Sequence, residues 1–164
     1  NINIVNNTIS GTTLSRYGIR VGNSGAHSNI NVKNNLVTGF LSGPIDIYRY
    51  SDSYALSIAN LNINNNSLYG NGNSNAISTS GNITPSPYNS TGNITSNPLL
   101  NSDFTIPANS PCRNAGLNVG LPYYESAPDI GAYEYIPPAP GGTSLLKDSN
   151  NNLIKDSNGN LIYN

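Results

Sequence analysis

Asn29-Ile30-Asn31-Val32-Lys33-Asn34-Asn35-Leu36-Val37-Thr38-Gly39 is one copy of a motif that recurs along this chain. Two further copies run from Asn1 to Gly11 and from Asn60 to Gly70, and a weaker copy covers residues 92–100. The second asparagine of the Asn-Asn pair marks the motif. With the expected counterpart in the weak copy, the markers are Asn7, Asn35, Asn66 and Asn97, which stand 28, 31 and 31 residues apart. A period of this length is typical of solenoids, propellers and other repeat arrays.

Apolar and polar residues alternate within each copy, which is the periodicity of a β-strand. Aligning the copies gives three apolar columns and one polar column: Ile4, Val32, Ile63 and Ile94; Ile9, Val37, Leu68 and Leu99; Ile2, Ile30 and Leu61; and Asn3, Asn31, Asn62 and Asn93. Strands that repeat in register stack in parallel about 4.8 Å apart. The pattern therefore predicts an all-β fold, a parallel β-helix.

The marker asparagines and the glycines that follow them fit this prediction. Stacked asparagine side chains can bond to one another, because each amide carries donors and acceptors. Gly11, Gly39 and Gly70 follow the markers by four residues, where the chain is expected to turn away from the strand.

Composition excludes several classes of function. Only 9% of the 164 residues are charged and the net charge is −1, so no basic face for nucleic acid is expected. The chain has no apolar run long enough to span a membrane. The single cysteine, Cys112, and the single histidine, His27, allow neither an internal disulfide nor a multi-histidine metal site, and we predict no metal or cofactor. We expect Cys112 to be buried packing and His27 to be an exposed turn residue.

Asn1 already lies inside a copy of the motif. We therefore expect the chain to be the C-terminal part of a longer polypeptide, or its mature or proteolysed remainder. If the chain is truncated there, the first coil has an open strand edge. Such an edge favours association with another chain.

A second apolar segment follows each marker and supplies the candidate site: Gly18-Ile19-Arg20-Val21, Asp46-Ile47-Tyr48-Arg49 and Ala76-Ile77-Ser78-Thr79. If Ile19, Ile47 and Ile77 point inward, Arg20, Tyr48 and Ser78 point outward in one column. The candidate carbohydrate-binding residues are Tyr17, Arg20, Asp46, Tyr48 and Tyr50, since aromatic faces stack on sugars while Arg and Asp bond their polar groups. The alternative is a solvated sheet face with an ordinary ion pair.

Residues 97–135 carry a different, non-repeating pattern. It includes Asn97-Pro98-Leu99-Leu100, Asp103-Phe104-Thr105-Ile106, Ser110-Pro111-Cys112-Arg113-Asn114-Ala115-Gly116 and Asp129-Ile130-Gly131-Ala132-Tyr133-Glu134-Tyr135. This series resembles the closing motif of bacterial and viral right-handed parallel β-helix proteins of the pectin-lyase-like superfamily, NPxF…DFxLxxxSPAIDAG…DIGAYEY. The chain departs from it at Leu100, in place of Phe, and at Cys112-Arg113-Asn114, in place of Ala-Ile-Asp.

The resemblance implies a right-handed parallel β-helix over residues 1–100, closed by a C-terminal cap over residues 101–136. We expect Asp129 and Glu134 to hydrogen-bond the final turn. The apolar residues available to cover the open end of the stack are Phe104, Ile106, Leu117, Ile130 and Tyr133.

Residues 137–143 read as a Pro/Gly linker, and residues 144–164 form a tail with an eight-residue repeat. Apolar pairs separated by Asp-Ser-Asn turns predict small hairpins or short successive strands. Because two hairpins alone are marginally stable, the tail should pack on the β-helix of its own chain, on a sister chain or on a larger assembly.

The superfamily includes polysaccharide lyases, hydrolases, adhesins and phage tail spikes, so the fold does not select a function. Glycoside hydrolysis needs two spaced carboxylates, and residues 1–100 hold only Asp46 and Asp52. We therefore predict no catalytic residue, and an extracellular or virion surface protein with a structural or carbohydrate-engaging role, as in adhesins and tail spikes. Its expected partners are a polysaccharide or cell-surface glycan, and further copies bound through the N-terminal edge or the tail.

Two alternatives stay open. In the first, the chain belongs to a polysaccharide lyase or glycoside hydrolase whose catalytic residues lie on missing N-terminal coils or at a subunit boundary. In the second, it is a self-assembling filament or trimer subunit.

Overall fold

The structure is a computed structural model that describes residues 1–12, 14–23, 25–49, 56–72, 76–80, 88–138 and 145–163. Within these ranges the chain forms strands and no helix. The strands are β1 (Ile2–Val5), β2 (Thr8–Ser10), β3 (Tyr17–Asn23), β4 (Gly25–Lys33), β5 (Leu36–Thr38), β6 (Gly43–Arg49), β7 (Leu56–Asn64) and β8 (Ile77–Ser80). No segment in these ranges is a helix that could cross a bilayer.

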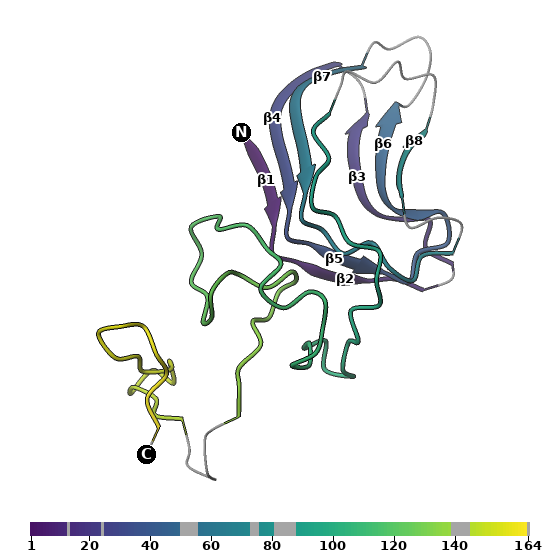
Figure 1. Ribbon diagram of the computed structural model, residues 1–164. Helices are drawn as coiled ribbons and strands as arrows, with labels where there is room; N and C mark the ends of the chain where they lie inside the picture. The colour runs from purple at the N-terminus through teal and green to yellow at the C-terminus, as the bar shows by residue number, and fades with distance from the viewer. Residues whose placement is uncertain are drawn as a thin grey trace.

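The strands pair in parallel in three sheets, ordered β1-β4-β7, β2-β5 and β3-β6-β8. Neighbouring strands within each sheet come from successive copies of the motif, which we call repeats. In Figure 1 the β1-β4-β7 and β3-β6-β8 sheets face each other, and the β2-β5 sheet lies between their lower ends. The prediction of an all-β chain of stacked parallel strands is therefore confirmed.

For the strands of the Asn-rich motif, the predicted register is confirmed in the first three repeats. Ile30 pairs with Ile2 on one side and Leu61 on the other, and Asn31 pairs with Asn3 and Asn62 in the same way. Apolar side chains from all three sheets meet in one core between them: Ile19, Val21, Ile30, Val32, Val37, Phe40, Ile45, Ile47, Ile58, Leu61, Ile63 and Leu68. The repeat thus forms strands because its alternate residues are removed from water on the inner face.

The marker asparagines form a hydrogen-bonded ladder. Asn7 Nδ2 donates to Asn35 Oδ1 over 2.8 Å, Asn35 Nδ2 to Asn66 Oδ1 over 3.0 Å, and Asn66 Nδ2 to Asn93 Oδ1 over 2.9 Å. The predicted fourth marker, Asn97, is therefore wrong, and the spacings in the ladder are 28, 31 and 27 residues.

The second polar column shifts in the same way in the fourth repeat. Asn89 Nδ2 donates to Asn62 Oδ1 over 3.1 Å, so Asn89 holds the place expected for Asn93. Ile94 pairs with Ser67, not with the inward-facing Ile63. The predicted places of Asn93 and Ile94 in these columns are therefore wrong.

The first residue of each Asn-Asn pair takes the left-handed conformation. The φ angles of Asn6, Asn34 and Asn65 are 51°, 56° and 53°, and Gly92 continues the column with φ 67°. Asparagine and glycine adopt this conformation at lower cost than other residues, which explains their presence at this corner. Among the glycines expected at the next turn, Gly39 has φ 83° and Gly70 has φ 76°.

Residues 98–138, which we call the flank segment, lie beside the stack. Their apolar side chains form a second core with Leu36 of β5, made by Ile106, Cys112 and Ile130. Asn34 Nδ2 donates to the carbonyl of Leu117 over 2.7 Å, and Asn34 Oδ1 accepts from the Leu117 N–H over 2.8 Å. These contacts fix the segment to the corner between β4 and β5.

The flank segment differs in position from the expected cap over the open end. Ile106 and Ile130 are buried against Leu36 on the side of the stack. Phe104, Leu117 and Tyr133, expected to cover the end, are 48%, 38% and 54% exposed. Leu36 explains the placement: it points away from the main core, and only a covering segment removes it from water.

The tail forms three antiparallel bridges, between Leu145 and Tyr163, Lys147 and Leu153, and Lys155 and Leu161. Three backbone bonds close it into a ring: Leu146 N–H donates to Ile162, Ile162 to Ile154, and Ile154 to Leu146. Small hairpins or successive short strands were predicted here, and the described residues form isolated antiparallel bridges.

Aspartates close the two turns of the tail. Asp156 Oδ1 accepts from the N–H groups of Asn158 and Asn160, each over 2.8 Å, and Asp148 accepts equivalent bonds in the preceding repeat. Lys155 Nζ donates to the carbonyl of Tyr123 over 2.8 Å and lies 4.7 Å from the Tyr124 ring centroid, so the tail contacts the flank segment.

Candidate functional site

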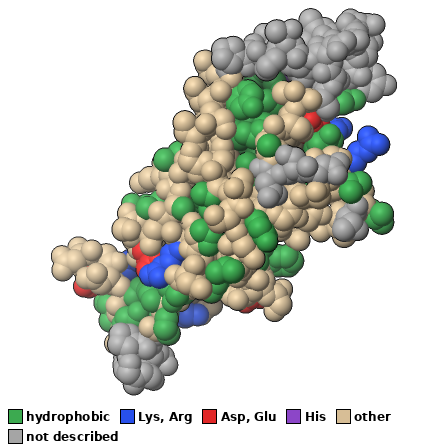
Figure 2. Space-filling model, turned by 45° about the vertical axis from the view of Figure 1, so that its right-hand side comes forward, with side chains coloured by type: hydrophobic (Ala, Val, Ile, Leu, Met, Phe, Trp, Pro, Cys, Tyr) green, Lys and Arg blue, Asp and Glu red, His purple; other side chains and the backbone are tan. Residues whose placement is uncertain are grey.

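Charged side chains are sparse on the face shown in Figure 2, which is mostly apolar or uncharged. The sequence-predicted site is one of the few places where a charged pair meets aromatic rings. Arg20, Asp46 and Ser78 lie side by side on β3, β6 and β8. This corrects the predicted column, in which Tyr48 stood between Arg20 and Ser78. Tyr48 instead pairs with Gly22.

Asp46 is a buried carboxylate whose partners include Arg20 and Ser78. Its Oδ2 lies 3.0 Å from Arg20 Nε, and its Oδ1 accepts a hydrogen bond from Ser78 Oγ over 3.1 Å. The Asp46 side chain is 0% exposed, whereas that of Arg20 is 41% exposed. Burying a carboxylate is costly unless it is paired and hydrogen-bonded, so Asp46 serves to position Arg20.

Two tyrosines flank the Arg20 guanidinium. Its central carbon lies 4.9 Å from the Tyr17 ring centroid and 4.1 Å from the Tyr48 ring centroid. Such cation–π contacts restrict the arginine and favour a fixed orientation. One face of each ring therefore lies against Arg20 and is not open to stack on a sugar.

A hollow of about 270 Å³ lies beside this cluster, lined by Arg16, Tyr17, Gly18 and Arg20. Only the Nε of Arg20 has an acceptor among the residues that the structure describes. The two outer nitrogens are therefore available to an external carboxylate or hydroxyl. Tyr50, the fifth predicted site residue, lies outside the described residues, as does Asp52.

The flank segment contains a separate cluster of carboxylates. Asp129 accepts hydrogen bonds from the N–H groups of Asn114 and Tyr135, and both oxygens of Glu134 lie 3.2 Å from the Asp129 N–H. The prediction that Asp129 and Glu134 hold the final turn is confirmed. Arg113 pairs with Glu125 through two nitrogens.

Burial changes the acidity of this cluster. Burial, and then repulsion by the Asp129 carboxylate, raise the pKa of Glu134 to about 7. Burial also raises the pKa of Asp129, although the N–H groups of Tyr135 and Asn114 oppose the change. Because both carboxylates bind backbone N–H groups of their own turn, we assign them a structural role.

The predictions for the single cysteine and the single histidine have different outcomes. Cys112 is fully buried in the second core, as predicted, and burial raises the pKa of its thiol. His27 lies within β4, half-buried and opposite Ile58, so the expected exposed turn position is wrong. Across the described part of the chain, no three His, Cys, Asp or Glu side chains are grouped to hold a metal ion.

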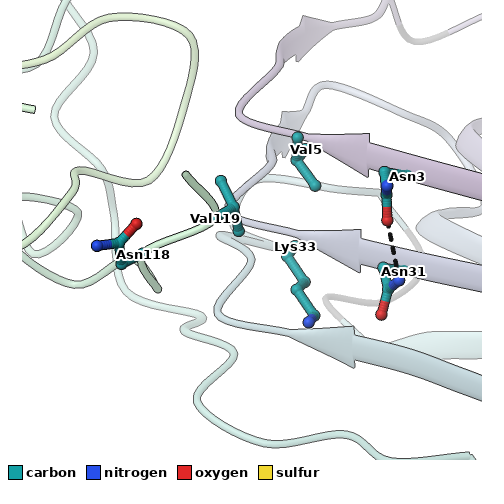
Figure 3. Close-up of a pocket in the computed structure, with 6 residues that line it drawn as sticks. All are labelled: Asn3, Val5, Asn31, Lys33, Asn118 and Val119. Atoms are coloured by element: carbon teal, nitrogen blue, oxygen red, sulfur yellow. Dashed lines mark hydrogen bonds between the residues drawn. The ribbon is translucent and has the colours of Figure 1, made fainter. Parts of the chain in front are cut away.

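A second hollow, of about 220 Å³, was not predicted from the sequence (Figure 3). Strands β1 and β4 contribute Asn3, Val5, Asn31 and Lys33, and the flank segment contributes Asn118 and Val119. The motif places the first four side chains on one outer face, but nothing in the sequence shows that a loop more than eighty residues later lies against them.

Comparison with known proteins found no protein-family model, curated protein or solved structure that matches this chain.

Proposed function

We propose that the chain is a non-catalytic, carbohydrate-engaging part of an extracellular or virion surface protein, built as the end of a right-handed parallel β-helix. Parallel sheets formed by successive repeats and the Asn7–Asn35–Asn66–Asn93 ladder support the architecture. The sheets stack identical positions along one axis, as solenoids do.

The observation that carries the functional part is the geometry of Arg20. A buried aspartate and two tyrosine rings orient its guanidinium, and Arg20 is one of the residues that line a hollow. An arginine held in this way offers two parallel N–H donors to a carboxylate or to neighbouring hydroxyls. Pre-orientation reduces the entropy lost on binding, which favours ligand capture.

The lack of a suitable carboxylate pair supports a non-catalytic role. Asp46 is the one acidic residue in the described part of the repeats, and both of its oxygens bind neighbouring side chains. A buried carboxylate committed to an arginine is a poor general acid or nucleophile.

The test is binding of the full chain to an array of neutral and carboxylated oligosaccharides, followed by titration of the glycans retained. We expect Arg20→Gln to weaken binding about tenfold or more, because the charged fork is lost. Lys147→Gln, which removes one positive charge from the tail, is the matched control and should bind as the unchanged chain does. Retention of no glycan, or equal binding by Arg20→Gln, would contradict the proposal.

A further inference from the structure

The hollow in Figure 3 lies on the outer face of the β1-β4-β7 sheet and shares no lining residue with the hollow beside Arg20. Asn31 and Lys33 are two residues apart on β4, so both extend from the same face of the sheet. Asn118 and Val119 approach from the flank segment across the strand ends. The hollow therefore combines a sheet face with a loop.

The loop wall is fixed in place. Asn34 bonds both the N–H and the carbonyl of Leu117, the residue just before Asn118. At Gly116, a Cβ would lie 2.9 Å from the Pro128 carbonyl oxygen, so only glycine allows this close approach. Gly120 follows with φ 86° and donates its N–H to Asn118 Oδ1 over 2.9 Å. The hollow is thus largely preformed, as binding sites usually are.

The polar groups that line the hollow are unequal in kind. The side-chain oxygens already accept hydrogen bonds: Asn31 Oδ1 accepts from Asn62 Nδ2, and Asn118 Oδ1 accepts from the Gly120 N–H. The ammonium of Lys33, which is half-buried, and the amide nitrogen of Asn118 have no acceptor among the described residues. Hydrogen-bond donors and a positive charge are therefore left over.

An unpaired ammonium attracts an anion, and the Asn118 amide, which Figure 3 draws beyond Val119, adds donors at the far rim of the hollow. Val5 and Val119 add apolar surface to the same hollow, which suits the C–H groups of a compact organic ligand. We propose that this hollow binds a small hydroxylated anion, such as an acidic sugar, with its anionic group on Lys33. The proposal does not depend on the Arg20 site. Arg20 does not line this hollow, and Lys33 does not line the hollow beside Arg20.

The experiment is an NMR titration of the full chain with sodium glucuronate, glucose and sodium sulfate in separate samples. We expect glucuronate to cause saturable shifts at the Asn31 and Asn118 side-chain amides and the Val119 methyls, with a Kd on the order of 1 mM. Glucose should cause much smaller shifts. Sulfate that saturates the same signals as tightly as glucuronate would show that the charge alone is recognised and would overturn the hydroxylated ligand class.

Two variants assign the effect to Lys33. Lys33→Gln should weaken glucuronate binding about tenfold or more, whereas Lys33→Arg, which keeps the charge, should retain most of it. Lys147→Gln in the tail is the matched control and should leave binding unchanged. Equal binding of glucose and glucuronate, no saturable shift up to tens of millimolar, or full binding by a folded Lys33→Gln variant would each overturn the proposal.

Discussion

Single side chains of this protein have roles set by burial rather than by residue type. Asp46 and Asp129 are both carboxylates removed from water, yet one orients an arginine and the other organises a backbone turn. Each is acceptable in the interior because its oxygens are hydrogen-bonded. Glu134 differs from them, because both of its oxygens accept from a single donor, the Asp129 N–H, and its carboxylate lies next to that of Asp129.

Glu134 should therefore make stability depend on pH. Its pKa is about 7 in the folded chain, against an ordinary value of 4.5. Between these values the folded chain holds a proton that the unfolded chain releases, so Glu134 stabilises the fold at low pH and this contribution is lost as pH rises through 7. We expect the free energy of unfolding to fall by roughly 1–2 kcal/mol between about pH 5 and pH 8, after allowing for solvent screening.

Denaturant unfolding at both pH values measures this difference. Glu134→Gln keeps an oxygen acceptor but cannot ionise, so the difference should shrink to that of the remaining groups. Asp103→Asn, at an exposed aspartate whose pKa is lowered by its bond to Thr105, is the control and should retain it. A pH dependence that survives intact in Glu134→Gln would rule out this carboxylate as its source.

At the scale of strands and ladders, the sequence predicts pairing well where residue identity repeats. Asn31 is flanked by asparagines in both neighbouring strands, and its register is as predicted. The prediction fails in the fourth repeat because Asn97-Pro98-Leu99 resembles the motif more than the true copy, which includes Asn89 and Asn93, does. That copy places Ser90 after Asn89, where earlier repeats have Ile4, Val32 and Ile63. Hydrogen bonding to Asn62 rather than apolar similarity therefore sets its register.

The candidate site was predicted as a set of residues but not as an arrangement. Ile19, Ile45 and Ile77 pair across β3, β6 and β8, at 12, 10 and 11 residues after the asparagines of the ladder. The connections before these strands differ in length, so counting from the marker misplaces the second strand by two residues. A shift of two preserves the inward and outward faces, which is why the same side chains still meet.

The asparagine ladder is the element we expect to be most sensitive to substitution. Asn66 is fully buried, accepts from Asn35 and donates to Asn93 and to the carbonyl of Val32. Asn66→Ala would remove the acceptor of the buried Asn35 N–H and the amide that donates to the Val32 carbonyl, at a cost of roughly 2–4 kcal/mol in the free energy of unfolding.

Asn89→Ala provides the matched comparison, because Asn89 is exposed and gives up one bond to Asn62. Its cost should be about 0.5 kcal/mol or less. Urea unfolding of both variants measures the difference. Similar costs at the two positions would mean that burial does not strengthen the ladder.

For the molecule as a whole, the apolar clusters indicate where stability resides. The main core and the second core draw on the repeats and the flank segment, and neither includes a described residue of the tail. No described tail side chain is fully buried. The flank segment could have been anticipated from Leu36, an apolar residue on the outer side of β5, but the sequence does not reveal which segment covers it.

Removal of residues 143–164 should therefore leave the rest of the fold intact. The described contact of the tail with the flank segment runs through Lys155, at the Tyr123 carbonyl and the Tyr124 ring. We expect the melting temperature to change by no more than about 4 °C, because the loss of one partly exposed contact costs about 1 kcal/mol or less.

Light scattering on the same truncated chain tests whether the tail acts within one chain or between chains. If the tail docks on its own flank segment, truncation should leave the number of chains per particle unchanged. Lys155→Met should behave like the truncation. The alternative, a filament or trimer joined through the tail, predicts concentration-dependent assembly of the full chain that disappears on truncation. A fall in the number of chains per particle, together with an unchanged melting temperature, would therefore place the Lys155 contact between copies. The flank segment of one chain would then bind the tail of the next.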